Sequence, residues 1–367
     1  MRNLLIVLLA FCFSQSFAWA QKKENVSCRV ISATQDADAV HNGVLYWLPK
    51  TVIRVQVDAD LVVRKAGPFF RYSQKYLNIS EVVKEDETVW QIVGVSLDGV
   101  GLPDDSQVYK IITDGYGSAP MVNFTPLGII CGINSCPSNN ECSLPGNTIS
   151  YTAPIVSFDE VPLGEEVLTK TSSAAMAEEA AFAIYRLRKK RTDLLGSESG
   201  KVAGDGVALQ SILEEINRLE TAYVSLFKGA EKRLRVTRYF DFVADAANPV
   251  SNVLLRFSPQ KGLLDRMDVS GTPVYIDVIP LEKKALNVVP TGAKRSDEVN
   301  GLRYILPGRA LVKLTDRNVP LLEQEMLLSQ FGQVATLPVS LLQQSGVQIK
   351  ICPVTGALLQ INRQTSK

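Results

Sequence analysis

The stretch GVLYWLPKTVIRVQV, residues 43–57, is rich in the β-branched and aromatic side chains that favour β-strands. Its second half, VIRVQV at residues 52–57, alternates apolar and polar side chains with the period of a half-buried strand. Strand character resumes at residues 61–63, after the acidic stretch DAD at residues 58–60, which is typical of a turn. We therefore predict a hairpin or meander here, within a fold built mainly on strands.

Segments of the same character recur on both sides of the middle of the chain. They are residues 88–97, 108–112, 233–242, 253–257, 273–279 and 304–314. Residues 43–49 and 301–307 also share Gly, Tyr, Leu and Pro at the same offsets, which suggests a duplicated β-unit. The sequence thus predicts one β-rich region before the middle and another after it.

The middle of the chain has helical periodicity. Apolar residues recur at helical spacing from residue 171 to 195, and again every three or four residues between Leu209 and Leu226. A Gly-rich segment at residues 196–206 separates the two, and Gly229 follows the second as a C-cap residue would. Two such helices joined by a short loop predict an antiparallel helical hairpin.

A basic run, RLRKKR at residues 186–191, lies on the first of these predicted helices. Such a run is typical of a solvated helix face. Glu214, Glu215 and Glu220 on the second helix are suitable partners for it across the hairpin. A docking patch for an anionic surface is the alternative interpretation.

Together these patterns predict an α+β fold of two β-rich, mostly antiparallel domains bridged by a long antiparallel helical hairpin. The predicted parts are a signal peptide at residues 1–20, an N-terminal β-rich domain at 21–165, the hairpin at 166–229 and a C-terminal β-rich domain at 230–367.

The opening residues, MRNLLIVLLAFCFSQSFAWA, have the three parts of a secretory signal. Arg2 supplies the positive start, residues 4–13 form an apolar run too short to span a bilayer, and AWA at residues 18–20 is a cleavage site. Acylation of Cys12 is disfavoured because the bulky Phe11 precedes it. We expect an exported protein that is periplasmic or associated with the outer membrane or cell surface, with no later transmembrane segment.

The charge balance bears on the kind of partner. Loss of Arg2 with the leader reduces 39 basic residues to 38, which equals the 38 acidic residues. A net charge of zero argues against nucleic acid as a partner recognised by bulk electrostatic attraction. The hydrophobic content of 46% is ample for a folded core.

The densest cluster of reactive side chains is CGINSCPSNNEC at residues 131–142. Its C-x4-C-x5-C spacing fits neither the paired cysteines of structural zinc sites nor the C-x4-C-x2-C spacing of plant-type iron–sulfur proteins. Exported thiols are usually oxidised, so we predict a disulfide between Cys136 and Cys142 around an obvious turn. Cys131 lies in a strand-like segment and is expected to pack inward as a small apolar residue.

Two further cysteines lie far apart in the sequence. A bridge between Cys28 and Cys352 would join the two ends of the mature chain. Because five cysteines follow the leader, at least one is free or paired with another molecule. No metal site and no cofactor is predicted.

No catalytic residue is assigned either. The single histidine, His41, precedes a Gly and a strand, where a solvated loop residue belongs, and zinc sites built on several histidines are excluded. The stretch SLFK at residues 225–228 matches S-x-x-K, but it lies at the end of a helix and lacks the companion S-D-N and K-T-G motifs. Trp47 and Trp90 are expected in the core rather than as sugar-binding platforms.

The carboxyl-terminal motifs resemble those of a known family. They are GLRYILPGRALVKL at residues 301–314, SQFGQVATLP at 329–338 and PVTGALLQI at 353–361. The family is an uncharacterised exported family of Bacteroidetes, the domain of unknown function number four-eight-three-one. Earlier stretches are similar to its beginning and its second helix, namely YWLPK at 46–50, LGIICGIN at 127–134 and LETAYVSLFKG at 219–229.

The resemblance covers nearly the whole mature chain. It implies an envelope or extracellular location and no assigned activity, so it supplies no catalytic residues. The loop from Cys136 to Cys142 looks like an addition to the family pattern.

These observations favour an exported cell-envelope protein with a non-enzymatic binding or scaffolding role, whose partner is an envelope protein or a glycan. The alternative is a carbohydrate-active or other hydrolytic enzyme that uses paired carboxylates. A cleft with two carboxylates about 5–9.5 Å apart, flanked by exposed aromatic side chains, would favour the enzyme. A shallow surface with an exposed apolar patch would favour the binding protein.

Overall fold

The computed structural model describes residues 27–33, 43–114, 121–135, 151–196, 206–245, 251–281, 301–342 and 346–363. Its strands are β1 (Ser27–Ser32), β2 (Val44–Lys65), β3 (Glu87–Asp114), β4 (Val122–Phe124), β5 (Ile130–Ile133), β6 (Ala230–Phe242), β7 (Asn252–Ser258), β8 (Gly262–Leu264), β9 (Thr272–Pro280), β10 (Gly301–Asp316), β11 (Val319–Pro338), β12 (Val347–Ile351) and β13 (Leu358–Arg363). Its helices are η1 (Phe70–Tyr72), α2 (Ser73–Leu77), α3 (Glu165–Leu168), α4 (Ser173–Gly196), α5 (Gly206–Lys228) and α6 (Val339–Leu342).

The strands form three sheets in which paired strands run antiparallel. The arm sheet has the order β1-β3-β2-β6, the outer sheet β11-β10-β9-β7-β8 and the end sheet β13-β12-β5-β4. Strands from the first and last parts of the chain therefore share two of the three sheets.

The predicted fold class, two β-rich domains bridged by a helical hairpin, is wrong. β6 follows the helices in sequence but pairs along β2, with Ile53 opposite Phe242 and Lys65 opposite Ala230. The buried strand β2 has backbone donors and acceptors on both edges, and β3 satisfies only one of them. The β-rich regions are thus interwoven through shared sheets, and α4 and α5 lie beyond one end of them.

The predicted turn at residues 58–60 is also wrong, because β2 runs through it without interruption. The pairing with β3 shifts register between Asp58 and Ala59, which marks a bulge. Asp60 lies 5% exposed within the strand and is held by Arg235 of β6. Asp58 accepts a hydrogen bond from the Thr237 hydroxyl at 2.5 Å. Side-chain partners from β6 satisfy both carboxylates, so neither has to reach solvent in a turn.

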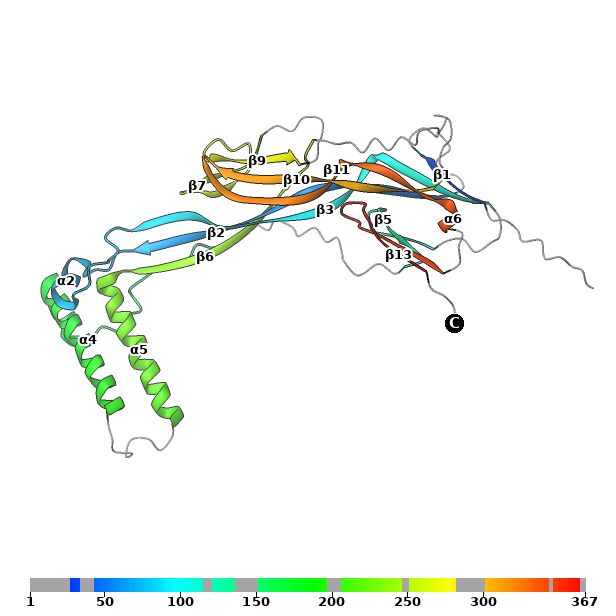
Figure 1. Cartoon of the computed structure of the whole chain (residues 1–367). Coiled ribbons are helices and arrows are strands. Elements are labelled where there is room, and N and C mark those ends of the chain that lie inside the picture. Colours follow the sequence, from blue (N-terminus) through cyan, green and yellow to red (C-terminus); the bar gives the residue numbers. More distant parts are fainter. Residues whose placement is uncertain are drawn as a thin grey trace, which may run out of the picture.

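Three strands extend away from the other sheets as an arm, which comprises the ends of β2, β3 and β6 near Arg64 (Figure 1). Arg64 of β2 donates hydrogen bonds to Glu87 of β3 at 2.9 Å and to Glu231 of β6 at 2.7 Å. One guanidinium therefore ties together all three strands of the arm. The arm ends in a head made of η1, α2, α3, α4 and α5 (Figure 1).

The described residues form three apolar clusters. The largest packs the arm sheet against the outer sheet and includes Ile53, Val55, Leu255, Ile276 and Val312. The second joins the arm sheet and the ends of β10 and β11 to the end sheet and includes Tyr46, Leu48, Ile130, Leu302 and Ile349. The third belongs to the head, which therefore has a core of its own.

A buried polar contact fastens β2 to the strands that pack on it. The Thr51 backbone N–H donates to the Ser329 hydroxyl at 2.8 Å, and the Thr51 hydroxyl donates to the Val354 carbonyl at 2.9 Å. Close by, a Cβ at Gly101 would lie 2.0 Å from the Pro353 carbonyl oxygen, so only glycine fits there. This junction fixes the root of the arm.

The two segments that share Gly, Tyr, Leu and Pro, residues 43–49 and 301–307, lie at the start of long strands. Each of these strands pairs with the next long strand as a hairpin. The register shifts at the shared proline in both hairpins, between Trp47 and Pro49 and between Leu306 and Gly308. Their places in the fold agree with duplication, which stays a prediction.

Within the described ranges, no helix has the length and apolar character needed to cross a membrane.

Candidate functional site

The head is organised around the inner face of α4. Ala177, Ala180, Ala181 and Ile184 are at most 2% exposed and recur at helical spacing along that face. The small alanines allow the neighbouring elements to approach closely. Phe227 of α5 is fully buried in the same cluster.

A hydrogen bond from α5 also fixes the loop before α3. The Tyr223 hydroxyl donates to the Pro162 carbonyl at 2.6 Å and accepts the Gly164 N–H at 3.1 Å. The packing and this contact position α4 so that its opposite face lies outward.

The outer face of α4 carries two exposed aromatic rings beside two cations. Phe182 is 51% exposed and Tyr185 is 47% exposed, although both belong to a helix whose inner face is fully buried. Together with Arg186 and Lys189 they occupy positions i, i+3, i+4 and i+7, which lie next to one another on a helix. These four residues, which we call the α4 hole, line a shallow depression of about 430 Å³ together with Glu179.

The Tyr185 ring is held in place rather than free to turn. The Tyr185 hydroxyl donates to the Tyr76 carbonyl of α2 at 2.6 Å. The Arg188 guanidinium carbon lies 5.8 Å from the centre of the Tyr185 ring, a cation–π distance. Because both ends of the Tyr185 side chain have partners, a bound segment would meet a preformed surface.

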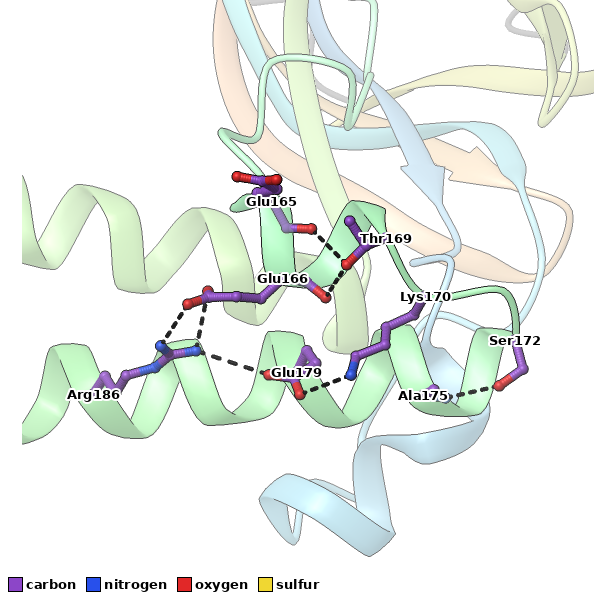
Figure 2. Close-up of polar contacts among 8 residues, drawn as sticks. All are labelled: Glu165, Glu166, Thr169, Lys170, Ser172, Ala175, Glu179 and Arg186. Atoms are coloured by element: carbon purple, nitrogen blue, oxygen red, sulfur yellow. Dashed lines mark hydrogen bonds and ion pairs between the residues drawn. The ribbon is translucent and has the colours of Figure 1, made fainter.

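Ion pairs between α3 and α4 fix the other side of the depression, as Figure 2 shows. Arg186 donates to both carboxylate oxygens of Glu166 at 3.3 and 3.4 Å and lies 3.9 Å from Glu179. Lys170 lies 3.4 Å from the other oxygen of Glu179. Two cations and two carboxylates thus balance one another, and this network contributes no net charge.

The start of α4 is fixed by a cap in the same view. The Ser172 hydroxyl accepts the Ala175 N–H at 3.2 Å, which satisfies one of the unpaired donors of the first turn (Figure 2). In α3, the Thr169 hydroxyl donates to the Glu165 carbonyl at 3.0 Å (Figure 2). The segment before α4 is therefore ordered by local bonds.

The rest of the basic run divides into paired and unpaired cations. Arg188 and Arg191 both bond to Glu220 of α5, at 2.7 and 3.0 Å. Lys189 and Lys190 have no ion-pair partner in the part of the chain that the structure describes. The outer face therefore has two uncompensated positive charges next to its aromatic rings.

Phe182 and Tyr185 are not singled out by the sequence patterns. The signal that could have found them is their position, since both lie off the apolar stripe through Ala177, Ala181 and Ile184. Large apolar side chains off the buried stripe of an amphipathic helix mark a surface that makes another contact.

The predicted disulfide residues Cys136 and Cys142 lie outside the described residues, as does His41. Cys131 is half-buried on β5, with its sulfur 3.7 Å from the Ile129 carbonyl oxygen. The Cys136–Cys142 pairing stays a prediction.

The predicted Cys28–Cys352 bridge is not seen. Cys28 lies on β1, where its backbone is opposite Thr113, but its side chain is outside the described residues. Cys352 is half-buried and its thiol is free. No disulfide occurs among the described residues.

The residues considered for an enzyme do not come together as a site in the structure. The Ser225 hydroxyl donates to the Ala222 carbonyl of its own helix at 2.6 Å, an ordinary helical back-bond rather than the geometry of a nucleophile. Trp90 is buried in the main core and meets Tyr151 edge-on at 5.2 Å. Trp47 is half-buried against Gly128.

Among the described residues, each carboxyl group whose pKa is clearly shifted has a lowered pKa. The pKa of Asp60 is lowered chiefly by the hydrogen bond from Arg235, and that of Glu231 chiefly by Arg64. Ser270 lowers the pKa of Asp268, and Arg218 lowers that of Glu215. A general acid needs the opposite shift, so these four carboxylates are suited to structural ion pairs and turns. Among the described residues, no group of three or more His, Cys, Asp and Glu side chains is arranged to hold a metal ion.

The comparisons with known proteins identify a family and nothing more specific. The sequence profile of the family described as Domain of unknown function (DUF4831) matches residues 42–359. No curated protein matches the chain, and no solved structure does. The predicted resemblance to this family is confirmed, whereas its link to export and to Bacteroidetes stays a prediction.

Proposed function

Since the chain belongs to the family described as Domain of unknown function (DUF4831), which names no activity, we propose a function from the site itself. The protein is an exported scaffold of the cell envelope that binds a helical segment of a protein partner in the α4 hole. Its activity is binding, without catalysis.

The single observation that carries this proposal is the arrangement of Phe182, Tyr185, Arg186 and Lys189 around a depression on an exposed helix face. Helices that pack side by side insert one side chain into a hole formed by four residues of the facing helix. The α4 hole has the i, i+3, i+4 and i+7 spacing of such a hole. A helix is therefore the occupant whose shape it fits.

The chemistry of the hole favours a protein segment over a glycan. Its surface consists mainly of carbon from two rings and from the stems of Arg186 and Lys189. Glycan recognition relies on many directed hydrogen bonds, and the polar ends of Tyr185, Arg186 and Glu179 are already bonded to other parts of the head. An apolar side chain flanked by a carboxylate would match both the rings and the cations.

The depression does not have the layout of a carboxylate enzyme. Its one carboxylate, Glu179, is already shared between Lys170 and Arg186. A glycosidase requires a second carboxylate across a cleft. This observation favours the binding role over the enzyme alternative.

The export part of the proposal rests on the first twenty residues and their AWA cleavage motif. The arm supports the scaffolding part, because it holds the head away from the outer and end sheets (Figure 1). A surface at the end of an arm is accessible to a partner while the sheets make other contacts.

The test is affinity capture from envelope extract with the tagged chain and its Phe182→Ala/Tyr185→Ala variant. We expect the wild-type chain to retain a protein that the double variant loses, since truncating two aromatic anchors typically weakens binding by about 2 kcal/mol or more. The matched control is Met267→Ala/Val269→Ala, which truncates two side chains that are 81% and 83% exposed in the loop between β8 and β9.

The control variant should capture the same protein as the wild type. Identical capture by all three chains would contradict a role for the α4 hole. Circular dichroism of each variant checks that the helices remain folded.

A further inference from the structure

We infer that the outer edge of β13 is a second binding site, which pairs with an extended, acidic segment of another protein as an added β-strand. This site is independent of the α4 hole, because the end sheet lies far from the head (Figure 1). Three features point to it: an unpaired sheet edge, exposed apolar side chains on that edge, and positive charge without a counterpart.

The edge belongs to the last strand of the end sheet. The sheet has the order β13-β12-β5-β4, and β12 pairs with β13 from Val347 opposite Arg363 to Ile351 opposite Leu358. In the described part of the chain, no strand pairs with the other side of β13. The backbone N–H and C=O groups on that side can therefore accept another strand. All side chains from Leu359 to Arg363 are exposed.

This edge lacks the protection that other edges of the molecule have. Natural sheets avoid unwanted pairing by making edge strands short or by placing prolines and charges on them. The other edge strands whose side chains are described in full follow this rule: β4 and β8 have three residues each, β6 carries the exposed Glu231, Lys232, Arg233 and Arg235, and β11 carries Pro320, Glu323 and Glu325. β13 has no proline, and its only charged residue is its last, Arg363. Its edge is thus suited to pairing.

The side chains of β13 show what an added strand would cover. Leu359 is 64% exposed and Ile361 is 44% exposed. Ile361 lies opposite the fully buried Ile349, and directly opposite residues share one face of a sheet. Ile361 therefore belongs to the face that packs on the core, but the core cluster ends before it. A further strand with an apolar residue opposite Ile361 would extend both the sheet and the core.

The charge of the end sheet gives the partner a second property. Arg363 is two residues beyond Ile361, so it lies on the same face of the strand. In the part of the chain that the structure describes, neither Arg363 nor Lys350 of β12 has an ion-pair partner. The four strands of the end sheet contain no Asp or Glu. The complementary strand therefore alternates apolar and acidic residues along one face, which places a carboxylate opposite Arg363.

Other occupants fit this edge less well. Pairing β13 with β13 of a second copy would join two end sheets that each carry Arg363 and Lys350 without an acidic residue in their strands. Like charges across an interface are unfavourable. A helix keeps its backbone hydrogen bonds within itself, so it cannot pair with a sheet edge. An extended acidic segment of a different protein supplies both the backbone groups and the charge.

The experiment is amide hydrogen exchange of the purified full-length mature chain, with and without a synthetic strand peptide. The probe is the peptide VTETVTETV, whose Val and Glu side chains alternate on one face, and the control is VTKTVTKTV, in which Lys replaces Glu. The Glu peptide should slow exchange within residues 358–363, because open amides of β13 gain acceptors. Its dissociation constant should be at least about tenfold lower than that of the Lys peptide.

A charge reversal tests the assigned role of Arg363. In Arg363→Glu the preference should invert, so that the Lys peptide binds more tightly than the Glu peptide. The matched control is Arg266→Glu, which makes the same change on an exposed residue of the loop between β8 and β9 and should behave as the wild type. Circular dichroism confirms that both variants remain folded.

Each other occupant gives a different result. Slow exchange within residues 358–363 of the monomer without peptide would show that another segment of this chain occupies the edge. Slowing that depends on the concentration of the chain would show that a second copy does. Either result, no response to the peptides or an equal response to both would overturn the inference. None of them bears on the α4 hole, which is tested by capture through Phe182 and Tyr185.

Discussion

At the scale of single residues, the arm depends on a buried carboxylate that is paired with a cation at the surface. Asp60 is 5% exposed on β2 and accepts a hydrogen bond from Arg235 at 2.9 Å. That bond is the main reason why the pKa of Asp60 is lowered. A lowered pKa in the folded state means that this contribution to stability is present above the ordinary aspartate pKa of about 3.9 and is lost as the pH falls through the folded value.

We predict that Arg235→Ala makes the protein unfold at higher pH during acid titration. Without its cation, the buried carboxylate of Asp60 is destabilised and takes up a proton more readily. Circular dichroism between neutral and acidic pH measures the midpoint. The control is Arg218→Ala, which removes the exposed partner of Glu215 and should leave the midpoint unchanged. An unchanged midpoint in Arg235→Ala would contradict the account of Asp60.

Asp60 also shows why the sequence alone is misleading at this position. Two aspartates around an alanine resemble a turn because aspartate is frequent in turns. The residue that satisfies Asp60 is Arg235, 175 positions away, and no local pattern reveals it. The partner of Asp58, Thr237, is 179 positions away for the same reason.

At the scale of elements, the two long helices and the strands β2, β3, β6, β7, β9 and β10 could be predicted from side-chain patterns. The helical spacing at residues 171–195 lies almost entirely within α4 at Ser173–Gly196, and that at Leu209–Leu226 lies within α5. The period-two segment 52–57 lies within β2. Side-chain periodicity reports which face of an element is buried, so it locates elements well.

Pairing between elements could not be predicted in the same way. The pairing of β2 with β6, across the whole of the head, joins residues with no shared local signal. The α4 hole could not be predicted from the sequence for a related reason. The basic run 186–191 is visible in the sequence, but the depression beside it depends on how α2 and α3 hold Tyr185 and Arg186.

Truncating a side chain on the buried face of α4 should lower stability far more than truncating one on its exposed face. Ile184 is fully buried in the head core, and Phe182, two residues away, is 51% exposed. Ile184→Ala should lower the free energy of unfolding by about 2–5 kcal/mol, because it leaves a cavity. Phe182→Ala should change it by no more than about 0.5 kcal/mol, because its ring lies outside the core.

Chemical denaturation followed by circular dichroism at helical wavelengths measures both values for the monomeric chain. Because both variants truncate side chains of the same helix, the difference in their stability reports which face of α4 is buried. A large loss of stability in Phe182→Ala would show that this ring belongs to the core of the head and is not reserved for a partner.

At the scale of the whole molecule, the three sheets and the head have different structural roles. The outer and end sheets, which pack on the arm sheet through two large cores, give the arm a fixed root. The arm carries a head with its own core at its far end (Figure 1), and α4 of this head bears the α4 hole. The two large cores and the α4 hole thus lie in different parts of one chain.

The most direct test of the α4 hole as a docking site is crosslinking in the intact cell envelope. A photoreactive amino acid is placed at position 182, and in a control chain at position 267, whose side chain is 81% exposed on the loop between β8 and β9. Irradiation should join position 182 to a protein and give a discrete adduct that position 267 does not give. Absence of an adduct at position 182, or the same adduct from both positions, would contradict the account.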